Sequence, residues 1–109
     1  MARSVKMAAD EGIRIESKDD IEDAIGLCGD GAGLLLTEDD VSARFFDVRT
    51  GLAEAAVKAL AERDVRAAFV VADPDDYGDR FAALVEAHAT HPRVRFMRTV
   101  AEAEAWLAQ

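Results

Sequence analysis

The loop from Phe46 to Gly51 (FDVRTG) places a carboxylate, a guanidinium and a hydroxyl close together. It lies between an expected strand and an expected helix, and ligands of open α/β sheets gather at this carboxyl end of the strands. Free backbone amides at the start of a helix favour an anion, and Arg49 adds a positive charge there. The candidate ligand- or partner-binding residues are therefore Phe46, Asp47, Arg49, Thr50 and Gly51.

The same loop also has a structural interpretation. Asp47 or Thr50 would cap the helix, and Gly51 would permit the turn. Taken alone, the loop favours this interpretation. A third hypothesis makes Asp47 the base of an enzyme, which requires a buried carboxyl with a raised pKa.

Other residues of chemical interest have simpler explanations. The spaced glycines of 28–33 follow an expected helix and open a strand, which is the reverse of a phosphate-binding loop. Cys28 falls on a buried stripe and has no evident basic partner that would lower its pKa. We expect Trp106 to cover the core rather than to stack on a ligand.

Two further patterns suggest metals but do not complete a site. Asp73 and Asp75 begin like a calcium loop, but Leu84 stands where a bidentate glutamate is needed. His88 and His91 lack further ligands, and His88 falls on a buried stripe. We therefore predict no catalytic set, no metal site and no cofactor.

Composition narrows the function classes. Acidic residues number 22 against 13 basic ones, and this net charge of −9 disfavours nucleic-acid binding. No apolar run approaches the ~20 residues of a membrane span, and no signal peptide is evident. The lone cysteine excludes an internal disulfide. We expect a cytoplasmic protein with a single domain over residues 1–109.

The stretch 45–73 predicts the unit around which the rest packs. Leu52, Ala56, Val57 and Leu60 form one stripe of a helix over 51–61. The nearly continuous apolar run 65–72 is typical of a central parallel strand covered on both faces. Proline at position 74 ends that strand.

The remaining elements follow from periodicity and capping residues. Val5 and Met7, then Ile13 and Ile15, alternate with polar residues and predict a first hairpin. Ser17 caps the next helix, and Gly29-Asp30-Gly31 ends it. The inward residues of that helix are Ile21, Ala24, Ile25 and Cys28. Residues 32–37 form a buried strand, and 38–47 hold a short helical turn.

In the last third, Asp73 and Pro74 start a helix that runs to about His88. Val94 and Phe96 mark the last strand. Thr99 and Glu102 form a capping box for the final helix, whose inward residues are Val100, Ala103 and Leu107. The predicted order is β-β-α-β-α-β-α-β-α, an α/β fold with a mixed, mostly parallel sheet and flanking helices.

The run Phe45-Phe46-Asp47-x-x-Thr50-Gly51-Leu52-Ala53-Glu54, with Tyr77 opening a later helix, resembles the bacterial domain-of-unknown-function 4180 family. The likeness extends from about Gly12 to Leu107. The sequence departs from the family pattern at 70–73, where a glycine is expected before the aspartate. Another departure lies at 78–80, where a Ser-Lys pair is usual. The family has no assigned activity, so the resemblance implies a fold rather than a function.

A more distant resemblance is to the STAS domain of anti-sigma-factor antagonists. In those proteins an Asp-Ser-Ser-Gly-Leu run opens a helix, and the serine before the glycine is phosphorylated. The resemblance implies a STAS-like fold, and it implies Thr50 as a phosphorylation site next to Arg49.

We expect a non-enzymatic regulatory module that binds a protein partner through the loop 47–51. The alternative is a small-anion or nucleotide-binding domain that uses the same loop and helix N-terminus. A homodimer is a further expectation, since small α/β domains often pair through an outer helix or edge strand.

Overall fold

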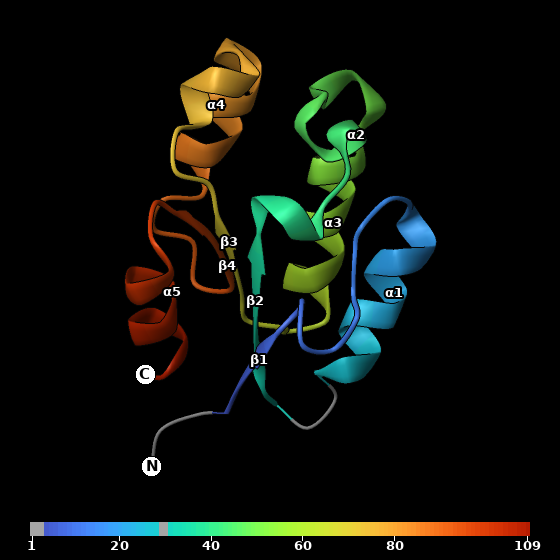
Figure 1. Ribbon diagram of the computed structural model, residues 1–109, viewed down its shortest axis with the longest axis vertical. Helices are drawn as coiled ribbons and strands as arrows, with labels where there is room; N and C mark the ends of the chain where they lie inside the picture. Colours follow the sequence, from blue (N-terminus) through green and yellow to red (C-terminus); the bar gives the residue numbers. More distant parts are fainter. Residues whose placement is uncertain (1–3, 29–30) are drawn as a thin grey trace.

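The computed structural model describes residues 4–28 and 31–109, and its strands form one parallel sheet (Figure 1). The strands are β1 (Val5–Met7), β2 (Gly33–Thr37), β3 (Ala67–Val70) and β4 (Val94–Met97), in the order β1-β2-β3-β4. Each strand pairs in parallel with the next one. β2 and β3 are therefore central, as their apolar sequences predict.

The described residues also form five α-helices and three short 3-10 turns. The α-helices are α1 (Lys18–Leu27), α2 (Ala43–Phe46), α3 (Leu52–Glu62), α4 (Asp79–Ala87) and α5 (Val100–Leu107). The 3-10 turns are η1 (Glu38–Asp40), η2 (Val48–Thr50) and η3 (Pro74–Tyr77). The predicted α/β fold with flanking helices is confirmed. None of the helices in the described residues is long and apolar enough to cross a membrane.

The two faces of the sheet carry separate apolar cores. Successive strand residues point to opposite faces. Leu34 and Leu36 therefore join the core under α1, α3 and α4, whereas Leu35 joins the core under α5. Figure 1 shows α5 on one side of the sheet and α1 and α3 on the other. The right-handed rule for consecutive parallel strands explains why α1, α3 and α4 share a face.

The predicted stripes of α1 and α3 are confirmed. On α3, the side chains of the predicted stripe are all buried, with at most 5% of their surface exposed. The stripe of α1 is buried too, and this helix begins directly after Ser17. The predicted short helical turn after β2 is present as η1 and α2. Of the predicted end of α1, Gly29 and Asp30 lie outside the described residues.

The predicted hairpin is wrong. β1 pairs in parallel with β2, and the segment 13–15 makes only a single parallel bridge, between Ile15 and Val41. β2 is buried along most of its length and needs a neighbour on each edge, and α1 provides the crossover that a parallel neighbour requires. Ile15 is fully buried without belonging to a strand. The described residues thus form four parallel strands rather than a five-stranded mixed sheet.

Two predictions about the last third need correction. The helix expected from Asp73 to His88 is divided, because Gly78 has φ 97° between η3 and α4. Glycine enters this backbone region readily, and other residues rarely do. Val100 is 37% exposed rather than inward, while Ala103 and Leu107 are buried as predicted.

Trp106 helps to hold helix α5 on the sheet. Its side chain is only 6% exposed, and the guanidinium groups of Arg66 and Arg95 lie 4.7 and 4.8 Å from its ring centroid. Arg66 also donates hydrogen bonds to the carbonyl oxygens of Trp106 and Gln109, at 2.8 and 3.0 Å. Arg66 thus caps the end of α5, and the prediction that Trp106 covers the core is confirmed.

Candidate functional site

An open cleft lies beyond the carboxyl ends of the central strands. The segment after β2 (α2 and η2) and the segment after β3 (η3 and the start of α4) stand above the sheet in Figure 1. Between them is a cleft of about 550 Å³. It is lined by Ala43, Phe46, Asp47, Val48, Arg49, Tyr77, Gly78, Asp79, Arg80 and Phe81. This is the edge of the sheet where the sequence predicts a site.

Three aromatic side chains join the two walls of the cleft. The rings of Phe46 and Tyr77 are stacked, with centroids 3.8 Å apart and planes 8° apart. Phe81 meets both rings edge to face, at 5.3 and 5.6 Å. Phe81 is fully buried, whereas Phe46 and Tyr77 are half-buried and can contact a ligand. The cleft therefore combines an ordered apolar surface with access from solvent.

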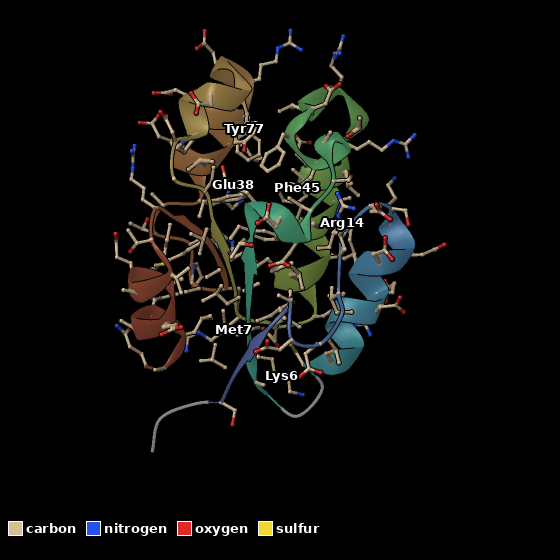
Figure 2. All side chains as sticks on the ribbon, viewed as in Figure 1. Lys6, Met7, Arg14, Glu38, Phe45 and Tyr77 are labelled. Atoms are coloured by element: carbon tan, nitrogen blue, oxygen red, sulfur yellow. The ribbon has the colours of Figure 1, made fainter. Side chains whose placement is uncertain are left out.

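A hydrogen bond fixes Tyr77 over the end of β2. Its hydroxyl donates to Oε1 of Glu38 at 2.7 Å, and Figure 2 labels both residues at this end of the molecule. The bond raises the pKa of Tyr77 to about 12, because losing the proton would leave two negative oxygens in contact; burial adds to the effect. Glu38 thus orients the ring that stacks on Phe46.

Titration of Tyr77 tests this contact. It is the only tyrosine in the chain, so phenolate absorbance reports it directly. We expect a midpoint near pH 12 in the native protein, against an ordinary value of 10. Because the folded-state pKa is raised, the stabilisation is complete below pH 10 and is lost as the pH rises towards 12. Glu38→Gln should lower the midpoint and the control Glu86→Gln should not. A native midpoint near 10 would show that the bond is absent in solution.

Asp47 and Arg49 form an ion pair on the rim of the cleft. Nε and Nη2 of Arg49 donate to the two carboxylate oxygens of Asp47, each at 3.0 Å. The backbone amide of Arg49 also donates to Asp47, at 3.1 Å. The side chain of Arg49 is 80% exposed and that of Asp47 39% exposed. An anion at this loop would therefore have to compete with Asp47 for the guanidinium group.

These contacts do not suit Asp47 to act as a catalytic base. The side-chain hydrogen bond from Arg49, and then the bond from its backbone amide, lower the pKa of Asp47. A general base of this kind needs burial and a raised pKa, whereas Asp47 is part-exposed and its pKa is shifted the other way. Asp47 therefore does not meet the requirements for a general base.

Thr50 and Gly51 both have structural roles at the start of α3. The Thr50 hydroxyl lies 2.7 and 2.8 Å from the carbonyl oxygens of Arg44 and Asp47, to which it can donate. It also accepts from the amide of Leu52 at 3.2 Å. Gly51 has φ 74°, and this left-handed residue joins η2 to α3. Thr50 thereby braces the loop from the side away from the cleft.

The predicted site residues are divided between two surfaces. Phe46, Asp47 and Arg49 line the cleft, whereas Thr50 lines a second pocket together with residues of α1 and α2. The prediction missed the opposite wall of the cleft, which is formed by residues 77–81. The family resemblance included Tyr77 as the residue that opens a later helix, but nothing in the sequence indicates that it stacks on Phe46.

The histidines are close together but poorly arranged for a metal. Their ring centroids are 5.4 Å apart. Nδ1 of His91 accepts hydrogen bonds from the amides of Arg93 and Val94, at 3.0 and 3.2 Å, so neutral His91 carries its proton on Nε2. The other ring nitrogen of His91 therefore has no lone pair for a metal. Within the described residues, no group of three or more His, Cys, Asp and Glu side chains could hold a metal ion.

Comparison with known proteins identifies a family but no activity. The model of one family, Domain of unknown function (DUF4180), matches residues 2–107. No curated protein and no solved structure matches the chain, so the likeness to the STAS domain is not confirmed. The match spans the cleft, the sheet and the flanking helices. The chain therefore belongs to the family described as Domain of unknown function (DUF4180).

Proposed function

We propose that this protein is a non-enzymatic, cytoplasmic regulatory module that binds a protein partner through the cleft between the loop 47–51 and residues 77–81. The observation that carries the proposal is the accessible aromatic surface of Phe46 and Tyr77 inside an open cleft. Aromatic residues are enriched among those that dominate binding energy at protein interfaces.

The rim of the cleft favours a protein partner over a strongly charged small molecule. The Asp47–Arg49 ion pair, Asp79 and Arg80 place both signs of charge around the aromatic surface. Within the described part of the chain, Arg80 makes no ion pair with another residue. An apolar centre with a polar, mixed-charge rim is the usual anatomy of a protein interface.

Affinity capture from the native host tests this proposal. Wild-type bait should retain a partner that is then identified, produced separately and titrated. We expect Arg80→Ala to weaken the complex about tenfold, because the arginine would lose a contact at the rim worth roughly 1–2 kcal/mol. Arg98→Ala is the matched control, since Arg98 is exposed and lies outside the cleft. Equal affinity of both variants and the wild type would rule out the cleft as the binding surface.

A second copy of this chain is one candidate partner. Among the described strands, β1 and β4 are the edges of the sheet and each pairs on one side only. Capture of an untagged copy by a tagged copy would reveal a homodimer. The same Arg80 and Arg98 variants would show whether the dimer uses the cleft.

The Thr50 region supports regulation as well as the alternative function. A phosphate on Thr50 would remove the hydroxyl proton that Thr50 can donate to the carbonyl oxygen of Arg44 or of Asp47, so modification would loosen the loop that forms one wall of the cleft. Intact-mass analysis of the captured bait tests for a phosphate on Thr50.

The alternative function, a small-anion or nucleotide-binding domain using loop 47–51, requires Arg49 to leave Asp47. A thermal-shift screen with nucleotides tests that alternative.

A further inference from the structure

A second pocket lies on the side of the loop away from the cleft. It has a volume of about 360 Å³ and is lined by Glu16, Ser17, Lys18, Arg44, Thr50 and Leu52. Folding brings these residues together from the starts of α1 and α3 and from α2. We propose that this pocket binds the phosphate group of a small molecule between the side chains of Lys18 and Arg44.

The charges of the pocket carry this proposal. Lys18 and Arg44 both line it, and neither forms an ion pair within residues 4–28 and 31–109. Both cations would attract a dianion placed between them in the pocket. Arginine provides a planar fork for two phosphate oxygens and lysine provides a compact charge. The side chains therefore suit a phosphate better than a singly charged anion.

Three backbone amides beside the pocket are already engaged. The Asp20 carboxylate accepts from the amides of Glu16 and Ser17, at 2.9 and 3.1 Å. The amide of Leu52 donates to Thr50. These three amides are not free for a phosphate, so the two basic side chains are its main partners, and its affinity should depend steeply on salt concentration and on each cation.

The surroundings limit the size of the ligand. Glu16 is the acidic residue of the lining, and its carboxylate pairs with Arg14 at 3.2 Å, which reduces its repulsion of an anion. The rest of the molecule contributes to a net charge of −9, which repels a long polyanion. The volume falls in the range of small-molecule sites. A phosphorylated metabolite fits these conditions, and a nucleic acid does not.

Calorimetric titration of the full chain with pyrophosphate and with inorganic phosphate, at low salt, tests the proposal. We expect saturable binding that Lys18→Ala and Arg44→Ala each weaken about tenfold, since each variant removes one charge-assisted hydrogen bond to the phosphate. Lys58→Ala and Arg98→Ala are matched controls that should change the affinity less than about twofold. Thermal unfolding without ligand checks that all four variants fold.

Three results would overturn the proposal: no binding by the wild type, equal weakening in all four variants, or binding that survives Lys18→Ala combined with Arg44→Ala. Loss of binding in the controls would indicate attraction by overall charge alone. This pocket and the cleft use different basic residues. Failure of the phosphate titration would therefore leave the proposed partner-binding cleft unaffected, and the reverse also holds.

Discussion

Replacing Phe45 by alanine should lower the free energy of unfolding by about 3–5 kcal/mol, the usual cost of truncating a buried aromatic residue. Phe45 is fully buried, and Figure 2 labels it in α2 above the sheet. Its ring centroid lies 5.1 Å from that of Phe69 on β3 and 6.5 Å from that of Phe96 on β4. The alanine variant would leave a cavity at the junction of the sheet and the cleft wall.

Urea denaturation followed by circular dichroism measures this effect. Phe45→Leu is the control for size, and it should cost less because most of the volume is kept. Phe46→Ala is the control for position. It should cost less stability than Phe45→Ala, because Phe46 is half-buried whereas Phe45 is fully buried. A loss below about 1.5 kcal/mol for Phe45→Ala would mean that the site collapses around the smaller residue.

The second large effect is expected for Trp106→Ala, which should also cost about 3–5 kcal/mol. Trp106 packs on the sheet face formed by Leu35, Ala68 and Val70, which α5 covers. Its removal would also take away the ring on which Arg66 and Arg95 lie, a contact worth roughly 0.5–2 kcal/mol for each pair. Trp106→Ala should therefore loosen the whole of α5 from the sheet, and the effect should not be confined to the replaced side chain.

Limited proteolysis measures this detachment. In Trp106→Ala, trypsin should cut after Arg98 much faster than in the wild type, because this arginine is exposed directly before α5. Trp106→Phe should retain most of the protection, since an aromatic ring remains over the sheet. Unchanged cleavage in the alanine variant would mean that other contacts hold α5, such as that between Leu107 and Gly33. A Cβ atom on Gly33 would lie 2.9 Å from Leu107 Cδ2, so the helix approaches β2 closely there.

The helices and strands that a local apolar pattern indicates were predicted correctly. The helix over 51–61 and the strand within 65–72 were both predicted, because the apolar period of each reflects how that segment alone is buried. The predicted hairpin was wrong. Alternating apolar residues at 13 and 15 report burial, but they carry no information on which strand lies alongside. Pairing of β1 with β2 depends on the crossover through α1, which is a property of the whole chain.

The candidate site divides in the same way. The loop 46–51 was recognised because a strand, a turn glycine and a helix follow one another in sequence. The sequence also suggested that Thr50 and Arg49 act together, yet Arg49 binds Asp47 on the cleft side and Thr50 binds backbone carbonyls on the other side. The direction of each side chain depends on the backbone conformation of η2. No residue pattern in the sequence predicts this 3-10 turn.

The sequence by itself therefore determined the α/β class, the central strands and the position of the loop, because periodicity and turn residues act over a few neighbours. Only the tertiary structure decided the stacking of Phe46 on Tyr77, the bond between Tyr77 and Glu38, and the placement of Lys18 and Arg44 around one pocket. These arrangements join segments about 25 to 40 residues apart, and only the packing of helices on a shared sheet brings such segments together.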